Sequence, residues 1–358
     1  MSYRIAVGPY HIALEEPYKI EVECEGETVV GANLKVGFNF RGIEWLAERK
    51  NITQCIALLE RVCGICSHTH SMTFCMGVER LGGLEIPARA SYVRTVVAEL
   101  ERIHSHLLWA GVAAEMIGFQ TVFMQIFRLR ERVMDLLESS SGNRVNYSMN
   151  RVGGVNRDLD RADAIRAGAR EIGEVVAKTV LPLFASDRTV AARCRGVGRL
   201  TLADAIAYGA VGPVARASGL DVDLRRDSPY LAYGDLDFTV PVAKEGDVLS
   251  RVVVRALEIV ESCRIIEQAL DRMPAGPLHL GEVFSVPAGE TVLRVEAPRG
   301  EVFYYLESNG TDRLARVKVR TPSFANIPTA VPMVKGGMLA DVPLVQAAID
   351  PCYSCTDR

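Results

Sequence analysis

Two cysteine pairs are the residues of this sequence whose type and spacing best suit chemistry. Cys63 and Cys66 form one Cys-x-x-Cys turn, and Cys352 and Cys355 form a second at the far end of the 358-residue chain. Each turn brings two thiolates close enough to bind one metal ion, and four soft sulfur ligands suit zinc, iron or nickel. Because most of the chain separates the two pairs, we expect a catalytic or redox metal, with a structural zinc site as the alternative.

The other cysteines fit a packing role. The chain has nine cysteines, an odd number, and its first residues lack the basic and apolar segments of a secretory signal. We therefore expect a reducing compartment, where paired cysteines bind metals or carry out redox chemistry rather than form disulfides. Five scattered cysteines are expected to be buried, inert thiols: Cys24, Cys55, Cys75, Cys194 and Cys263.

The composition is that of a folded chain. Hydrophobic residues make up 49% and charged residues 24%, with 41 basic and 44 acidic side chains and a net charge of −3. These fractions exclude a disordered or fibrous protein. The slightly acidic balance argues against nucleic acid as a partner, since nucleic-acid binding usually needs a basic face.

The sequence around the cysteines resembles that of a known family. Residues 61–66 (RVCGIC), followed by His70, resemble the first signature of nickel–iron hydrogenase large subunits. Residues 350–355 (DPCYSC) resemble the second signature. Other segments resemble group 4 of this family, the energy-converting membrane-associated enzymes (Ech-type, CO-linked and formate-linked). The same landmarks recur in the quinone-site subunit of respiratory complex I. These segments are 8–11, 40–44, 212–219 and 321–326.

The resemblance implies a nickel–iron centre. All four thiolates would hold nickel, with Cys66 and Cys355 bridging to an iron that carries carbon monoxide and cyanide ligands. Cys63 and Cys352 would bind nickel terminally. The implied activity is the reversible reduction of protons to H2.

The resemblance also implies partner subunits. The chain has paired cysteines for one metal site only, so we expect no iron–sulfur cluster in it. Electrons would come from ferredoxin through a polyferredoxin-type subunit and an iron–sulfur cluster in a hydrogenase small subunit, while integral membrane subunits would translocate ions. We expect the chain to be cytoplasmic and peripheral on the inner face of the cell membrane, held there by these partners.

Three further residues are implied at the reacting face. Glu15 aligns with the family's proton-relay glutamate, with Glu16 one residue away; the competing interpretation is a solvated loop carboxylate. Arg299 resembles the arginine over the open metal face, where its permanent charge can polarise H2 or orient a base; otherwise it is a solvated arginine at a hairpin edge. Asp350 is expected to hydrogen-bond to Arg299, or else to cap the turn before Pro351.

Three more residues are implied around the metals. His70 is expected to donate a hydrogen bond to the sulfur of Cys66. Ser323 would hydrogen-bond to a diatomic ligand of the iron, or else cap a helix. Pro298, in the segment 297–300 (APRG), is expected with Ser323 to contact the cofactor.

Two positions depart from the better-known uptake hydrogenases. Ser105 replaces an aspartate near the metals and lacks its charge, so proton handling or the orientation of the arginine is expected to differ. Arg358 stands where many relatives have a metal-binding histidine, although Glu44 matches a usual carboxylate of that magnesium site. Glu44 thus supports a magnesium ion at this place, and Arg358 argues against it because a guanidinium cannot bind a cation. Relatives often carry a C-terminal extension that is removed after nickel insertion, and here it is either removed or not encoded.

The elements that position these residues follow from hydrophobic periodicity. Residues 18–38 alternate around a turn, which predicts a β-hairpin, and residues 290–320 alternate again with a turn at 308–310. Helical patterns cover residues 51–84, 91–140, 158–180 and 248–273. The second of these starts at Ser91 and has a predicted break near Gly118. Thr201 and Asp204 form a capping-box pattern before a short helix. We expect a mainly α, α+β fold in one domain over 1–358: a β-rich part (1–50), a core of long helices (51–285), and β-hairpins with the C-terminal metal motif (286–358).

Three alternatives remain open at this point. The apolar stretch 107–127 is long enough to span a bilayer, but Glu115 and two glutamines in it favour a buried core helix. A complex I-like coupling subunit without hydrogen chemistry is disfavoured because all four thiols are present. A structural zinc protein would use the same four thiols.

Overall fold

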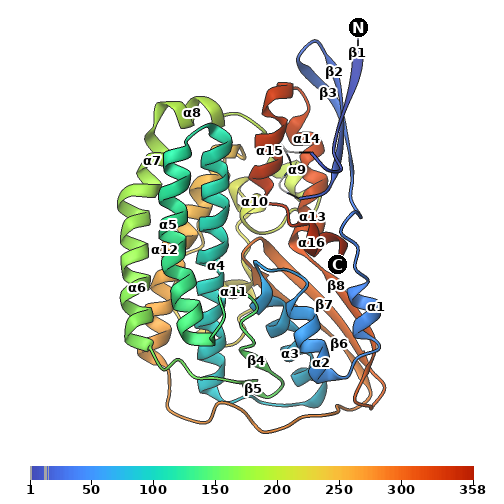
Figure 1. Ribbon diagram of the computed structural model, residues 1–358, viewed down its shortest axis with the longest axis vertical. Coiled ribbons are helices and arrows are strands. Elements are labelled where there is room, and N and C mark those ends of the chain that lie inside the picture. The colour runs from blue at the N-terminus through green and yellow to red at the C-terminus, as the bar shows by residue number, and fades with distance from the viewer. Residues whose placement is uncertain (1, 12–13, 15) are drawn as a thin grey trace.

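A bundle of long helices forms one side of the molecule, and two three-stranded sheets lie on the other (Figure 1). The computed structural model describes residues 2–11, 14 and 16–358. The bundle consists of α4 (Ala88–Ile117), α5 (Gln120–Ser141), α6 (Ala162–Val175) and α12 (Val248–Arg272). The expected mainly α, α+β class is confirmed.

The apolar stretch at residues 107–127 is a helical corner within the bundle. Gly118 ends α4 with a φ of 98°, a left-handed conformation that glycine adopts without steric cost, and α5 begins two residues later. The predicted break near Gly118 is therefore confirmed. Helix α4 starts at Ala88 rather than at the predicted Ser91, and Pro87 is the residue that precedes its first turn. Among the described residues, no helix is long and apolar enough to cross a membrane.

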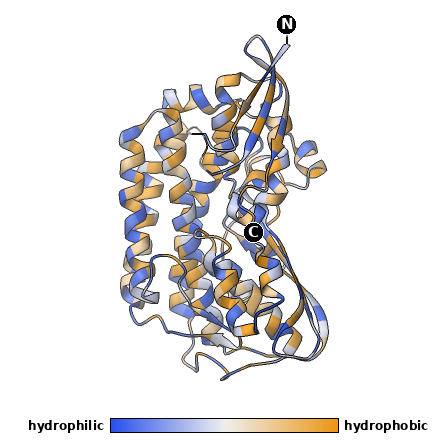
Figure 2. Cartoon of the chain, turned by 45° about the vertical axis from the view of Figure 1, so that its right-hand side comes forward, coloured by the Kyte–Doolittle hydropathy of each residue, from blue (hydrophilic) through white to orange (hydrophobic). Residues whose placement is uncertain are grey.

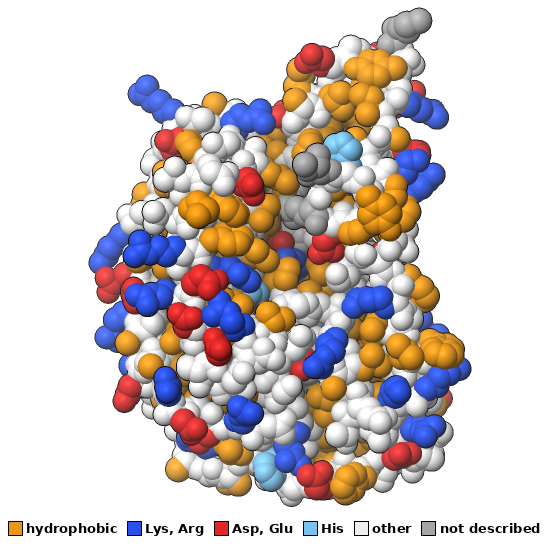
Figure 3. Space-filling view, in the orientation of Figure 1, with side chains coloured by type: hydrophobic (Ala, Val, Ile, Leu, Met, Phe, Trp, Pro, Cys, Tyr) orange, Lys and Arg blue, Asp and Glu red, His pale blue; other side chains and the backbone are white. Residues whose placement is uncertain are grey.

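Apolar and polar residues are both visible along the bundle helices (Figure 2). The outer helices α5 and α6 bury mainly apolar residues of one side, whereas α4 is buried along most of its length. On the face shown in Figure 3, acidic and basic side chains are interspersed over the bundle, as is usual for a solvated helix surface. The helix predicted for residues 158–180 begins at Ala162. It continues through a π-helical turn (η1, Val176–Val180) into α7 (Leu181–Ser186).

The N-terminal sheet contains three antiparallel strands, β1 (Ser2–Val7), β2 (Lys19–Glu25) and β3 (Thr28–Lys35). The predicted hairpin is confirmed for β2 and β3, although β3 ends at Lys35 rather than at residue 38. The chain then leaves the sheet, and Gly37 and Asn39 donate backbone hydrogen bonds to Asp357 at the other end of the protein. The short helix α1 (Ile43–Ala47) follows.

The C-terminal sheet contains β6 (Gly289–Ala297), β7 (Gly300–Ser308) and β8 (Leu314–Arg320) in antiparallel order. Alternate residues are buried, which confirms the predicted alternation over 290–320. Helices α2 (Ile52–Glu60) and α3 (Ser67–Gly82) lie between this sheet and the bundle (Figure 1), and the side chains of α3 pack on β6 and β7. Ala297 pairs with Gly300, so Pro298 and Arg299 alone form the turn between β6 and β7.

Short elements connect the sheets to the bundle. Thr201 caps α9 by accepting a hydrogen bond from the Asp204 backbone, as its capping-box pattern predicted. The short elements are β4 (Asn150–Arg151), β5 (Gly154–Val155), α8 (Arg188–Cys194), α9 (Leu202–Ala207), α10 (Gly212–Ala217), α11 (Leu224–Asp227), η2 (Tyr233–Asp235), α13 (Pro322–Asn326), η3 (Ile327–Thr329), α14 (Ala330–Val334), η4 (Leu339–Asp341), α15 (Val342–Ile349) and α16 (Tyr353–Asp357).

Candidate metal centre

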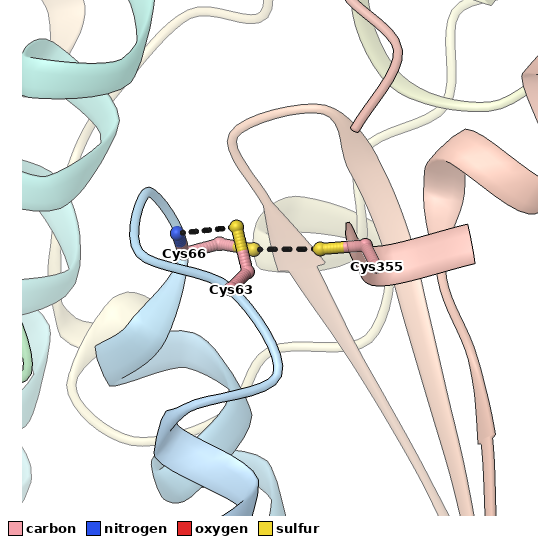
Figure 4. Close-up of side chains that lie close together, drawn as sticks. All are labelled: Cys63, Cys66 and Cys355. Atoms are coloured by element: carbon pink, nitrogen blue, oxygen red, sulfur yellow. Dashed lines mark hydrogen bonds between the residues drawn. The ribbon is translucent and has the colours of Figure 1, made fainter. Parts of the chain in front are cut away.

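The two Cys-x-x-Cys turns meet in one buried cluster. The Sγ atoms of Cys63 and Cys352 lie 3.4 Å apart, as do those of Cys66 and Cys355. Three of the sulfurs, those of Cys63, Cys66 and Cys355, lie within 4.8 Å of one another. Figure 4 shows these three side chains pointing toward one another from two separate segments of the chain. None of the four cysteines is more than 4% exposed.

Each turn is held by its own helix. Cys66 precedes the first turn of α3, and its backbone N–H points to the sulfur of Cys63 at 3.5 Å. Cys352 precedes the first turn of α16, and its sulfur accepts a hydrogen bond from the Cys355 backbone at 3.3 Å. The two turns are therefore built alike, with the first sulfur of each folded back over the N-terminus of a helix.

The ionisation of the thiols is suited to a cation. Hydrogen bonding with Cys352 and the other two thiols lowers the pKa of Cys63 well below its ordinary value, and Arg299 adds to this effect. Hydrogen bonding with Cys352 raises the pKa of Cys355. One thiolate thus forms readily, whereas further ionisation needs a positive charge such as a metal ion. Four buried thiols facing one another in this way fit a metal centre with soft ligands.

Arg41 connects the two Cys-x-x-Cys turns by hydrogen bonds. Its guanidinium donates to the carbonyl oxygens of Val62 (2.8 Å) and Ser354 (2.7 Å), one from each cysteine segment. Glu101 of α4 supports the first turn from the other side, since its carboxylate accepts hydrogen bonds from the backbone of His68 and Thr69. Burial raises the pKa of Glu101 to about 8 despite these donors.

Arg299 lies beside the thiol cluster, only 5% exposed. Its Nη2 is 2.6 Å from Oδ1 of Asp350, so the contact expected between these two residues is present. Its Nη1 donates to Oγ of Ser105 at 3.1 Å. Although burial disfavours the charge of Arg299, Asp350 and the neighbouring thiols raise its pKa well above the usual value. Ser105 therefore still orients the arginine, as an acceptor without charge.

Three sequence segments converge on the turn that carries Arg299. A Cβ atom added to Gly300 would lie 2.7 Å from the backbone nitrogen of Gly212, so the two backbones approach too closely for a larger residue at either position. Asn326 donates to the Arg299 carbonyl at 3.4 Å and exchanges two hydrogen bonds with the backbone of Val211. The segments 212–219, 297–300 and 321–326 thus form one support for the guanidinium.

The position of His70 corrects the sequence expectation. Its Nε2 lies 3.6 Å from the sulfur of Cys355, whereas the expected partner was Cys66. The backbone of His70 bonds to the Cys66 carbonyl as the next turn of α3, and this geometry directs the ring toward α16. Its Nδ1 is 2.8 Å from the hydroxyl of Tyr304, and burial lowers the pKa of His70 to about 4.

Glu15 lies outside the described residues, and Glu16 is the carboxylate that the structure places at the centre. Its Oε2 accepts backbone hydrogen bonds from Tyr353 (2.6 Å) and Ser354 (3.0 Å), between the two cysteines of the second turn. Burial raises the pKa of Glu16, and these two N–H groups oppose the shift. Glu16 is therefore not a solvated loop carboxylate.

The two expected cofactor contacts are both buried. Oγ of Ser323 accepts a hydrogen bond from the backbone N–H of Cys352 at 2.9 Å, which leaves its own proton for another acceptor. Thr321, not Ser323, caps α13. Pro298 is buried in the turn next to Arg299.

The residues around Glu44 do not fit the expected magnesium site. Oε1 of Glu44 is 2.9 Å from Nε of Arg358, and Oε2 is 2.6 Å from Nζ of Lys318. Both oxygens already face cationic side chains, and the backbone of Val319 donates to Oε1 as well. The arginine at position 358 thus supplies the positive charge itself, which removes the reason to expect magnesium there.

The other five cysteines are buried, as predicted. Burial raises the pKa of Cys55 to about 12 and that of Cys194 to about 11, so these thiols stay protonated. Sequence reasoning missed the roles of Arg41 and Glu101. Arg41 stands in the segment 40–44 that carried the family resemblance, but Glu101 has no local signal, because it meets α3 only through the packing of α4.

Comparisons with known proteins agree with this site. Residues 41–110 match the family model of nickel-dependent hydrogenases. Residues 116–283 and 279–358 match the model of the 49 kDa subunit of respiratory-chain NADH dehydrogenase. The first match contains the first cysteine pair, and the second contains the other pair and Arg299.

Similarity to individual proteins extends over the whole chain. The chain is 42% identical to the carbon monoxide-induced hydrogenase of Rhodospirillum rubrum, over 100% of this chain and 99% of that protein. It is 41% identical to the membrane-bound hydrogenase subunit alpha of Pyrococcus furiosus, over 99% of this chain and 87% of that protein. A chain of the membrane-bound sulfane sulfur reductase, an archaeal respiratory membrane complex, superposes with a TM-score of 0.94 at 34% identity, covering 100% of this chain and 98% of that one.

The fold is that of a subunit of the membrane-bound sulfane sulfur reductase, and the sequence is similar to hydrogenases along its whole length. The chain belongs to the family that includes both membrane-bound hydrogenase subunits and the 49 kDa subunit of respiratory-chain NADH dehydrogenase.

Proposed function

We propose that this chain is a hydrogenase catalytic subunit that reversibly reduces protons to H2 at a nickel–iron centre. The observation that carries the proposal is the convergence of Cys63, Cys66, Cys352 and Cys355 in one buried cluster. The sulfurs pair as Cys66 with Cys355 and Cys63 with Cys352. That pairing is consistent with the family resemblance, which implies Cys66 and Cys355 as bridging ligands and Cys63 and Cys352 as terminal ligands. When bound, the nickel–iron group supplies the redox change and the open coordination position that the reaction needs.

The chain's own residues hold and orient the site. Arg299 presents a fixed positive charge beside the thiols and is itself held by Asp350 and Ser105. Neutral His70 bridges Tyr304 and Cys355, and the hydrogen bond to the sulfur reduces the charge that this thiolate must carry. Ser323 keeps a hydroxyl proton available beside Cys352 for a ligand of the metal.

Proton delivery is the task of the carboxylates before β2. Glu16 lies against the backbone between Cys352 and Cys355, and the charge of Cys63 contributes to the raised pKa of Glu16. Glu15 is the position implied by the family alignment and stays a candidate. A carboxyl group whose pKa is raised toward neutrality can both accept and donate a proton under working conditions.

The electrons come from other subunits under this proposal. The donor is ferredoxin, and the route passes through an iron–sulfur cluster in a small subunit. Integral membrane subunits couple the reaction to ion translocation, and the chain is held at the inner face of the membrane by them. The membrane-bound character of the hydrogenase and reductase relatives supports such an assembly.

Metal analysis together with activity assays tests the proposal. Protein purified with its partners under anaerobic conditions is expected to contain nickel and iron in near-equal amounts and to evolve H2 from reduced ferredoxin. Sulfane sulfur reduction without H2 evolution would place the chain functionally with the sulfane sulfur reductase relative instead. A preparation with zinc alone would favour the structural alternative, and one without metal would favour a coupling subunit.

A further inference from the structure

A cluster of buried charges lies between the bundle and the C-terminal sheet, outside the thiol cluster. It includes three arginines: Arg102 of α4, Arg216 of α10 and Arg225 of α11. It includes four carboxylates: Glu99 of α4, Asp223 before α11, Glu258 of α12 and Glu296 of β6. All seven side chains are at most 4% exposed.

The support for the four carboxylates is uneven. Arg255 of α12 is also buried and acts on Glu258, so four guanidinium groups serve four carboxylates. An ionised carboxylate in a buried site is costly unless it is well paired and hydrogen-bonded, and binding of a proton removes its charge. The carboxylate with the weakest support is therefore expected to hold a proton.

Three of the carboxylates are well supplied with donors. Glu99 faces Arg102 and Arg225 and also accepts hydrogen bonds from the hydroxyls of Tyr233 and Ser262, both at 2.6 Å. Each of these donors stabilises the ionised form of Glu99.

Asp223 and Glu258 have a close charged partner each. Asp223 forms a two-pronged pair with Arg225, at 3.0 and 2.7 Å. Glu258 lies 2.8 Å from Arg216 and accepts from Nε2 of His106, also at 2.8 Å. Burial lowers the pKa of His106 to about 4, so the imidazole is neutral and contributes no charge.

Glu296 is the carboxylate with the least support. Its Oε1 is 2.8 Å from Nη1 of Arg216, and the same nitrogen lies 3.5 Å from Asp223. Its Oε2 has only a long contact of 3.4 Å, with the backbone N–H of Leu224. The hydroxyl of Tyr230 bonds to the backbone nitrogen of Glu296, not to its carboxyl group.

We propose that Glu296 is a proton-binding site, and that the proton it holds removes the charge of the least supported carboxylate in the buried cluster. This inference goes beyond the proposed function and does not depend on the metal centre. Burial, together with the charge of Asp223, raises the pKa of Glu296 to about 7, and the attraction of Arg216 and Arg102 opposes the shift. The proton is thus exchangeable near neutral pH.

The site is connected to the turn that carries Arg299. Glu296 lies three residues before Arg299, and Arg102 donates to the carbonyl oxygens of Glu296 (2.7 Å) and Ala297 (3.0 Å). A change in the charge of Glu296 therefore acts on a segment adjoining the candidate metal centre.

Infrared difference spectroscopy tests the assignment directly. A pH change from 8 to 6 is expected to produce the carbonyl band of a protonated carboxylic acid, shifted in D2O, with a midpoint near neutrality. Glu296→Gln, which mimics the protonated form and preserves its shape, is expected to remove the part of this band with a midpoint near 7. The part contributed by Glu101, whose pKa is about 8, should remain. Glu282→Gln, at an exposed surface ion pair with Arg151, is the matched control and is expected to leave the band unchanged.

A second variant checks the cause of the proton affinity. Asp223→Asn removes the carboxylate that shares Arg216, so the midpoint of the same band is expected to move to lower pH. The proposal is overturned if the part of the band with a midpoint near 7 persists in Glu296→Gln, which would assign it to another buried carboxyl group. It is also overturned if Glu296 titrates at the ordinary glutamate value of about 4.3. A protein without nickel or H2 evolution would count against the proposed function only.

Discussion

The four paired cysteines differ from the other five in what surrounds their sulfurs. Cys352 faces Cys63 at 3.4 Å and receives its orientation from Ser323, whereas Cys263 packs in the bundle core, where burial raises its pKa far from neutrality. All nine thiols are buried, so burial alone does not distinguish the groups. What distinguishes them is the presence of other thiols and a fixed cation nearby.

Replacement of Cys352 by serine is expected to abolish nickel binding or all H2 activity. A hydroxyl group is a harder and far less acidic ligand than a thiol, so the four-sulfur set is broken. Nickel content by elemental analysis is the measurement. Cys263→Ser is the control, because it changes a buried thiol outside the cluster, and it should retain nickel if it folds. Full nickel content in Cys352→Ser would contradict the assignment.

The proton relay is tested by comparing Glu16→Gln with Glu15→Gln. The variant that lacks the relay is expected to keep its nickel but to lose exchange between H+ and D2 by a factor of about 100 or more. The carboxamide of glutamine can still accept the hydrogen bonds from Tyr353 and Ser354, so the fold of the second turn is preserved in Glu16→Gln. Normal exchange in both variants would place the relay elsewhere.

At this scale the sequence identified residue types better than contacts. The cysteines, Arg299 and Asp350 stood out by motif, and the structure brings them together. The partner of His70 was wrong, because the choice between two adjacent sulfurs depends on how α3 faces α16. The residues around Glu44 do not fit magnesium, because Lys318, distant in sequence, shares Glu44 with Arg358.

At the scale of elements, the turn between β6 and β7 depends on a close approach of two glycines. Gly300 has a φ of 123°. The position where a side chain would begin is occupied by the backbone of Gly212 at the start of α10. This contact fixes where the turn sits, and hence where Arg299 points. Asn326 of α13 completes the support from a third element.

Gly300→Ala is therefore expected to destabilise the protein by about 1–3 kcal/mol and to lower H2 activity while the cysteines remain intact. Gly310→Ala is a matched control, since this glycine also has a positive φ (85°) but has room for a methyl group in the other hairpin turn. The measurements are the free energy of unfolding and the specific activity. Equal effects of the two changes would show that the contact with Gly212 does not position Arg299.

Hydrophobic periodicity predicted most long elements but not their meeting points. The hairpins, the break at Gly118 and the helix now seen at Val248–Arg272 follow from local pattern and turn chemistry. The junction of the segments 212–219, 297–300 and 321–326 could not be predicted by periodicity, because it depends on long-range packing. The pattern likewise did not reveal the π-helical turn at Val176–Val180, which is a local change of helix winding.

At the scale of the whole molecule, the two ends of the chain meet at the centre. Asp357 accepts hydrogen bonds from the backbone of Gly37 and Asn39, and Arg41 binds carbonyl groups of both cysteine segments. We propose that residues 1–358 unfold as one unit, because each half supplies two of the four sulfur ligands.

The buried histidines predict how stability depends on pH. Burial lowers the pKa of His68 and His104 to about 3, and that of His70 and His106 to about 4. Below pH 6.5 the unfolded chain binds four protons that the folded protein does not, so acid favours unfolding. Carboxyl groups with raised pKa values act in the opposite direction: Glu101 (about 8), Glu296 (about 7), Glu16, Glu60 and Asp350. Carboxyl groups with lowered pKa values act in the same direction as the histidines: Glu44, Glu99, Asp223 and Glu258.

The free energy of unfolding is therefore expected to fall between pH 6.5 and pH 4.5, by about 1.4 kcal/mol per pH unit for each net proton taken up. Denaturant unfolding at several pH values is the measurement. The fall should be smaller in His104→Gln, which removes one of the four groups. Stability that rises steadily from pH 6.5 to pH 4.5 would show that these histidines do not dominate.

Whether the four sulfurs hold nickel and iron is the central claim. It is tested most directly by elemental analysis combined with infrared spectroscopy of the purified protein. The proposal predicts nickel and iron in near-equal amounts, together with infrared bands of carbon monoxide and cyanide bound to the iron. Zinc as the only metal, without those bands, would contradict it.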